Sequence, residues 1–155
     1  MGAGILDGGA GIDTLDVSHS TTTNVVNLAS GLVDWGSGGQ ESALNFENVI
    51  AGAGRSTITG TTGENRIEAG AGNDTMTGLS GADVFVFNLG DGVDIITDFE
   101  NGIDLLDFTS TGINFTDLVI STNSDGSTLV AYDNGQQIEL QNTTGLIDEN
   151  DFVFS

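Results

Sequence analysis

The residues of this sequence with the clearest capacity for chemistry are oxygen-bearing side chains that recur every nine residues. Four contiguous nine-residue blocks run from residue 51 to residue 86, and each has glycine at its fourth position. Their sixth positions hold Ser56, Asn65, Asp74 and Asp83. One separate copy at 8–16 and two looser copies at 89–97 and 99–107 place carboxylates at the same position: Asp13, Asp94 and Asp104. Carboxylate and carbonyl oxygens, in a chain with one histidine and no cysteine, are suited to binding a hard divalent cation.

The same repeat predicts the backbone that must position these oxygens. Glycine at the second and fourth positions lets a six-residue segment turn sharply with its carbonyl groups pointing inward. The other three residues form a short strand whose middle side chain, at the eighth position, is large and apolar and points into the interior. That position holds Val49, Ile58, Ile67, Met76 and Phe85. Two nonapeptides then complete one turn of a flattened parallel coil, so each loop stacks on the loop two repeats away.

Stacking by two repeats predicts which sixth-position side chains become neighbours. The expected pairs are Ser56 with Asp74, Asn65 with Asp83, Asp74 with Asp94, and Asp83 with Asp104. Several carbonyls and one or two carboxylates between loops suit Ca²⁺, which accepts six to eight oxygens, better than Mg²⁺, which requires a rigid octahedron. Because the last two pairs contain two carboxylates each, we expect them to bind calcium more tightly than the first two. The alternative is that these aspartates only stabilise Asx-type turns.

The nonapeptide GGxGxDxUx, in which U is a large apolar residue, resembles the calcium-binding repeat of the RTX (repeats-in-toxin) family of secreted bacterial proteins. The resemblance covers residues 8–107, and the later runs DVFVF, DIITDF and GIDLLDF are similar to the C-terminal regions of serralysin-type proteases. It implies an all-β fold, a parallel β-roll (β-solenoid), with several Ca²⁺ ions. The DxxxDF pattern adds Asp98 as a ligand near Asp94. The metal-site residues that we expect are Gly9, Gly11, Asp13, Asn65, Gly70, Gly72, Asp74, Gly81, Asp83, Gly92, Asp94, Asp98, Gly102 and Asp104.

Charge and composition narrow the choice of partner. The formal net charge is −21, from 23 acidic and two basic residues, so polyanions such as nucleic acid and anionic membrane surfaces are repelled. No apolar run approaches the roughly 20 residues of a membrane span. Hydrophobic residues make up 37% of the chain, enough for the core of one domain. We therefore expect calcium as a partner, and neither nucleic acid nor membrane insertion.

The pattern divides the chain into two parts. Residues 1–107 are expected to form the β-roll, with an irregular insertion at about 17–50 that makes a loop excursion around Trp35. We interpret Trp35 as a local cover over the apolar interior rather than as a carbohydrate-stacking residue. Because residues 2–7 match the last six positions of a nonapeptide, the sequence also predicts an upstream domain in a longer parent protein.

Residues 108–155 change to antiparallel patterning and are expected to form a C-terminal β cap. Strand-like runs at 115–122, 127–133 and 136–141, the last two joined by an Asn-Gly turn, predict a meander that closes the open end of the roll. The final segment, 146–155, places an acidic cluster before a short apolar run. It resembles the C-terminal signal read by the type I secretion machinery, and it is equally compatible with a last strand of the cap.

Catalysis is not expected. His19 is the only histidine, so a metalloprotease helix or a Ser-His-Asp triad cannot be built. A glycosidase needs a protonated carboxyl group beside an ionised one, whereas carboxylates that bind calcium stay ionised. No phosphate-binding loop is present.

Our leading hypothesis is therefore a calcium-binding module, secreted and extracellular, that folds on calcium outside the bacterial cell. It would support the type I secretion and the stability of a larger exported protein. The alternative is an adhesive module whose flat face binds a glycan or ice through Thr57, Thr59, Thr75 and Thr77, although neighbouring rungs interrupt that threonine array.

Overall fold

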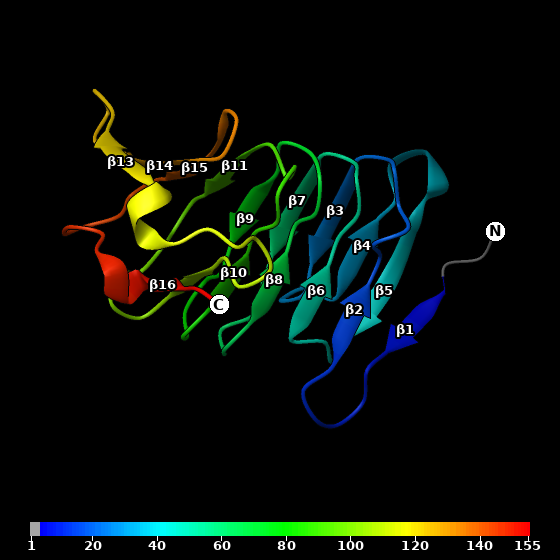
Figure 1. The fold of residues 1–155 in the computed structure, drawn as a ribbon. Coiled ribbons are helices and arrows are strands. Elements are labelled where there is room, and N and C mark those ends of the chain that lie inside the picture. Colours follow the sequence, from blue (N-terminus) through cyan, green and yellow to red (C-terminus); the bar gives the residue numbers. More distant parts are fainter. Residues whose placement is uncertain (1–3) are drawn as a thin grey trace.

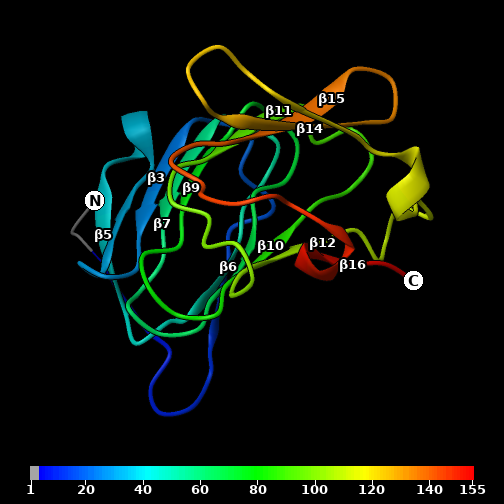
Figure 2. The same cartoon turned by 90° about the vertical axis from the view of Figure 1, so that its left-hand side faces the viewer.

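The computed structural model describes residues 4–155, apart from the side chain of Ser37, and shows two β-sheets that face each other across one core (Figures 1 and 2). The larger sheet contains, in spatial order, β1 (Ile5–Asp7), β5 (Gln40–Leu44), β4 (Leu32–Asp34), β3 (Asn24–Asn27), β7 (Ser56–Thr59), β9 (Thr75–Thr77), β11 (Val93–Ile96), β15 (Gln136–Leu140), β14 (Thr128–Tyr132) and β13 (Val119–Thr122). The smaller sheet contains β16 (Phe152–Val153), β12 (Leu105–Asp107), β10 (Val84–Val86), β8 (Arg66–Glu68), β6 (Asn48–Ile50) and β2 (Thr14–Asp16). Short 3₁₀ helices form at η1 (Gly36–Gly38), η2 (Phe115–Asp117) and η3 (Glu149–Asp151).

Successive nonapeptides alternate between the two sheets, as the repeat predicts. Strands β7, β9 and β11 are adjacent and parallel in the larger sheet, and β6, β8, β10 and β12 are adjacent and parallel in the smaller one. The register aligns the eighth positions, because Ile58 pairs with Met76 and Met76 pairs with Ile96. The predicted all-β parallel β-roll is therefore confirmed.

The core is a ladder of single apolar side chains. Eighth-position residues from both sheets, namely Val49, Ile58, Ile67, Met76, Phe85, Ile96 and Leu106, have 0% exposure. Each nine-residue repeat thus buries one large side chain fully. That is little apolar area relative to the conformational entropy lost when nine residues, several of them glycine, become ordered. The fold needs a further source of stability between its loops.

Residues 17–50 continue the roll as irregular rungs, and a short turn from Trp35 to Gly39, which includes η1, lies between β4 and β5. Strand β3 continues the larger sheet beside β7, and β4 and β5 follow it as antiparallel neighbours. Strand β6 lies in the smaller sheet between β2 and β8. Trp35 packs half-buried against the core, as expected of a cover, and its Nε1 donates a hydrogen bond of 3.1 Å to Glu41 Oε2. Of the partial repeat expected at 2–7, Gly2 and Ala3 lie outside the described residues, and Ile5–Asp7 forms β1.

The C-terminal strands extend both sheets of the roll. Strands β13, β14 and β15 form the predicted antiparallel meander, and β15 lies parallel beside β11. The strand predicted from residue 115 begins instead at Val119, because Asn114 caps the helix η2. Strand β16 lies beside β12 and closes the smaller sheet. Aromatic side chains fill the interior at this end, where the ring centroids of Phe108 and Tyr132 lie 5.0 Å apart. None of the helices within residues 4–155 has the length and apolarity needed to cross a bilayer.

Candidate metal centre

The loops between the strands stack into two columns, one along each edge of the roll (Figure 1). The first column consists of the loops 51–56, 69–74 and 89–94, each of which enters a strand of the larger sheet. The second column consists of the loops 60–65, 78–83 and 99–104, each of which enters a strand of the smaller sheet. Each loop ends on the sixth position of its nonapeptide, so the candidate ligands lie one above another.

In the first column, backbone and carboxylate groups connect adjacent loops directly. The Ser56 N–H donates to Asp74 Oδ1 at 2.5 Å, and the Asp74 N–H donates to Asp94 Oδ1 at 2.9 Å. The other oxygen of each carboxylate, Oδ2, is fully buried and has no hydrogen-bond partner. Two buried oxygens without donors, on carboxylates one loop apart, are what a cation between the loops would satisfy.

The second column has the same backbone-to-carboxylate hydrogen bonds, but neither Asp83 nor Asp104 has a fully buried oxygen without a partner. The Asn65 N–H donates to Asp83 Oδ1 at 2.8 Å, and the Asp83 N–H donates to Asp104 Oδ1 at 2.9 Å. The Glu100 N–H donates to Asp104 Oδ2 at 2.8 Å. All four neighbouring pairs expected from stacking by two repeats are thus linked by hydrogen bonds, which confirms the stacking order. That these residues bind calcium remains a prediction.

Glycine lets the stacked backbones approach closely enough for carbonyl oxygens to join the carboxylates. A Cβ added to Gly72, whose φ is 147°, would lie 3.2 Å from both Asp74 Oδ1 and the carbonyl oxygen of Gly54 in the loop below. A carboxylate and a carbonyl therefore converge at this point. A Cβ on Gly92 would collide with the carbonyl oxygen of Gly72. No larger residue fits between these loops without moving one of them.

The remaining predicted glycines lie in equivalent turns. Gly70 and Gly81 have positive φ and also face backbone atoms of the loop below, those of Gly52 and Gly63. The other three glycines, Gly9, Gly11 and Gly102, also have positive φ, but a Cβ added to them would meet no backbone atom of another loop within 4 Å. The Gly102 N–H donates instead to Asp151 Oδ1 at 2.9 Å, so the C-terminal helix η3 supplies a carboxylate to the last loop of the second column.

Burial of the carboxylates changes their acidity. Desolvation, followed by the like charges of neighbouring carboxylates, raises the pKa of Asp94 to about 8 and that of Asp74 to about 7. In the second column, desolvation raises the pKa of Asp83 to about 6 and also raises the pKa of Asp104. These groups are costly to ionise unless a cation lies beside them. The donor set is oxygen only, which fits Ca²⁺.

Asp98 is not placed where we expected it. Its two carboxylate oxygens accept hydrogen bonds from the Gly78 and Leu79 N–H groups, at 3.0 and 2.9 Å. Strand β11 carries the chain from one edge of the roll to the other, so Asp98 lies in the second column, where its charge raises the pKa values of Asp83 and Asp104. The expectation that it lies near Asp94 is wrong.

The structure adds residues that the repeat search missed. Glu47 occupies a sixth position nine residues before Ser56, and its Oε2 accepts a hydrogen bond of 2.9 Å from the Asp13 N–H. Asn45, at the fourth position of the same block, has a φ of 57° in place of glycine. The alignment of Val49 with the repeat could have revealed this block. Asp91, a third-position residue, is 5% exposed, and desolvation raises its pKa to about 6.

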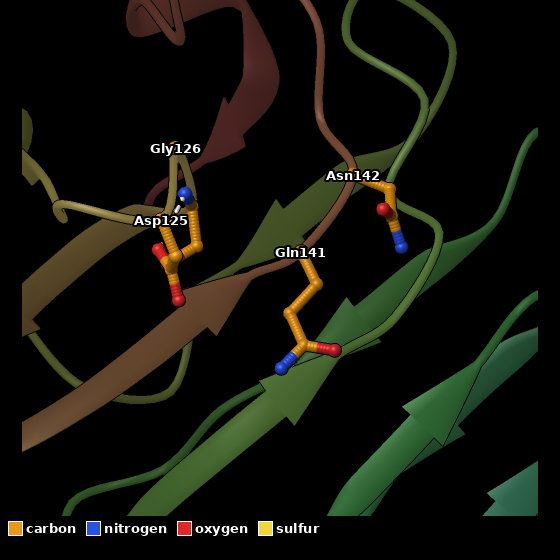
Figure 3. A pocket seen from close by; sticks show the side chains of 5 residues that line it. Asp125, Gly126, Gln141 and Asn142 are labelled. Carbon is orange, nitrogen blue, oxygen red and sulfur yellow. Dashed lines mark hydrogen bonds between the residues drawn. The ribbon is translucent and has the colours of Figure 1, made fainter.

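Two other features of the described residues bear on the choice of site. Within residues 4–155, no three His, Asp or Glu side chains gather as a metal cluster, so the candidate ligands are carboxylate pairs together with backbone carbonyls. A polar pocket of about 230 Å³ lies between the β13–β14 turn and the end of β15 (Figure 3). There Asp125 accepts hydrogen bonds from the N–H and the hydroxyl of Ser127, and Gln141 donates to Glu139, so these groups are partnered within the protein.

The comparisons with known proteins agree with this geometry. Residues 50–85 and 59–96 match the family described as RTX calcium-binding nonapeptide repeat (4 copies). No curated protein matches the chain. The solution structure of the AlgE6R2 subunit from the Azotobacter vinelandii mannuronan C5-epimerase is similar over 90% of this chain and 92% of that chain, with a TM-score of 0.59 and 20% sequence identity.

The stacked glycine-rich loops and alternating three-residue strands define the class as a parallel β-roll. Residues 50–96 match the RTX calcium-binding nonapeptide repeat, and the similarity to the AlgE6R2 subunit supports the β-roll fold.

Proposed function

We propose that this module folds when it binds calcium outside the bacterial cell, and that it supports the export and stability of a larger protein. The observation that carries the proposal is the pair of fully buried, unpartnered Oδ2 atoms on Asp74 and Asp94. Without a cation these carboxylates oppose the folded state, and the net charge of −21 opposes it further.

Calcium reverses this balance because it binds only the folded arrangement of the loops. One site at a calcium concentration one hundred times its Kd stabilises the folded state by about 2.7 kcal/mol. Extracellular calcium modules have Kd values of about 10⁻⁴ to 10⁻³ M, so such sites would be filled outside the cell and not in the cytosol. The chain would then cross a secretion channel unfolded and fold on emergence.

The type I secretion machinery is the proposed export route, and the acidic and aromatic segment 146–155 is the proposed signal. The upstream domain is the proposed cargo. The AlgE6R2 subunit likewise belongs to a larger protein, an epimerase, which supports a position beside another domain. We assign no catalytic role to this module.

Far-UV circular dichroism during a calcium titration of an EDTA-treated sample tests this function. We expect a cooperative transition from coil to β structure in calcium, and none at equal concentrations of magnesium. A protein that is compact and cooperatively folded in EDTA would refute calcium-dependent folding.

Export requires a separate test. A passenger protein fused upstream of the module should leave a bacterium that expresses a type I exporter, and deletion of residues 146–155 should retain it in the cell. If the module folds on calcium but the deletion variant is exported as well as the full module, the assignment of residues 146–155 as the signal is refuted, and calcium-dependent folding is not.

A further inference from the structure

Asn65 differs from the other sixth-position residues in how its side chain is satisfied. The residue is 3% exposed, and it lies in the second column between Glu47 and Asp83. Its Oδ1 accepts a hydrogen bond of 2.7 Å from the Thr61 N–H. The two hydrogens of its Nδ2 face three oxygens within hydrogen-bond distance: the Glu47 carbonyl at 2.7 Å, Thr61 Oγ1 at 2.9 Å and the Glu64 carbonyl at 3.2 Å.

These partners fix the orientation of the amide. If the group were rotated by 180°, its oxygen would face two carbonyl oxygens, and its nitrogen would face the Thr61 N–H. Both arrangements would be repulsive. The amide nitrogen therefore lies among oxygens contributed by two adjacent loops.

Asp74 and Asp94 have the opposite arrangement. Each carboxylate accepts one N–H from the adjacent loop and leaves its second oxygen buried without a partner. Loops of the same repeat thus fall into two kinds. One kind has buried oxygens that lack a positive partner, and the other supplies that partner from its own side chain.

We propose that the Asn65 amide nitrogen takes the place of a calcium ion between the loops of Glu47 and Asn65, so that this position holds the roll together without metal. This inference rests on the proposed function, because it states which loops bind calcium. It also replaces the ligand role that the sequence suggested for Asn65 with a donor role.

The first column also contains both kinds of loop, those with unpartnered carboxylate oxygens and those whose side chains are satisfied within the protein. Ser56 Oγ donates to the Gly54 carbonyl at 3.1 Å, and Asn24 Nδ2 donates to Ser20 Oγ at 2.8 Å. Neutral side chains with partners inside the protein thus lie at or just before the start of β3, β7 and β8, and the carboxylate pairs follow them along the chain. Asp13, Asp74 and Asp94 each have a buried Oδ2 without a partner, and calcium binding within the stacked repeats is concentrated on the carboxylate pairs Asp74 with Asp94 and Asp83 with Asp104.

The substitution Asn65→Asp tests this assignment by a gain of function. It replaces the amide NH₂ donor with a carboxylate oxygen that lies among the same oxygens, beside the Asp83 loop. The added negative charge then requires a cation. Asn114→Asp is the matched control, because Asn114 is exposed and lies outside both columns, its Oδ1 accepts from the Thr116 N–H, and aspartate retains that acceptor. Asn65→Ala removes the amide without adding charge.

The measurement is the number of calcium ions bound per molecule at saturating calcium, by equilibrium dialysis. We expect one more ion in Asn65→Asp than in the wild type, and the wild-type number in Asn114→Asp and Asn65→Ala. An unchanged number in Asn65→Asp, or one ion fewer in Asn65→Ala, would overturn the proposal. A wild-type protein that binds no calcium would instead refute the proposed function, which is a different result.

Discussion

Replacing Asp94 by asparagine should remove one calcium ion while preserving the shape of the loop. The side chain has 0% exposure, and its Oδ1 accepts the Asp74 N–H, a bond that an amide oxygen can keep. The buried Oδ2, which has no partner, becomes an NH₂ group that cannot bind a cation. Above the Kd, each bound ion adds about 1.4 kcal/mol to the free energy of unfolding for every tenfold increase in calcium.

Loss of one ion should therefore reduce the slope of the unfolding free energy against calcium concentration by about 1.4 kcal/mol per tenfold change in calcium. Urea unfolding at a series of calcium concentrations, all high enough to fold both proteins, measures the slope. Asp16→Asn is the matched control, because Asp16 is exposed on β2 and lies outside both columns. An Asp94→Asn slope equal to that of the wild type, or an equal loss in Asp16→Asn, would refute the reasoning.

Three further predictions follow from the same geometry. In EDTA, lowering the pH through about 8, the pKa of Asp94 in the folded state, should increase the β signal in circular dichroism, because the folded state then binds a proton that the unfolded carboxyl binds only near pH 3.8. A β signal that falls over this pH range would contradict the prediction. In calcium, Gly92→Ala should lower the free energy of unfolding by about 2 kcal/mol more than Gly126→Ala, since both glycines have positive φ but only Gly92 faces the carbonyl of a stacked loop. Equal losses of stability in urea unfolding would argue against close stacking of the loops. Arg66→Ala breaks the 2.8 Å ion pair with Asp107 but should cost less than about 1 kcal/mol in the same assay, because Arg66 is half-exposed; a larger loss would show that the pair is structurally important.

The repeat region could be predicted from sequence because its pattern is local. Glycine at fixed positions and one apolar residue per strand determine the turn, the strand and the register together, so the neighbours of Asp74 and Asp83 follow from counting. The insertion at 17–50 could not be predicted in this way, because β4 and β5 pair antiparallel through contacts that no repeat encodes. Glu47 was missed for a related reason, since Asn45 stands in for glycine and hides the block.

The misplacement of Asp98 has a different physical cause. The DxxxDF pattern suggested a ligand near Asp94, but the intervening strand spans the width of the roll and separates the two carboxylates into different columns. The distinction between Asn65 and the aspartates also required the structure. Both residue types supply a side-chain oxygen, and only the hydrogen-bond partners show that the Asn65 amide acts as a donor toward the adjacent loop.

A crystal structure grown in calcium, with anomalous scattering used to locate the ions, would show directly which loops bind calcium. We predict calcium between the Asp74 and Asp94 loops and between the Asp83 and Asp104 loops, with oxygen ligands at about 2.3–2.6 Å. We predict no ion beside the Asn65 amide. Well-ordered loops that contain only water at both carboxylate pairs would refute calcium binding by these loops.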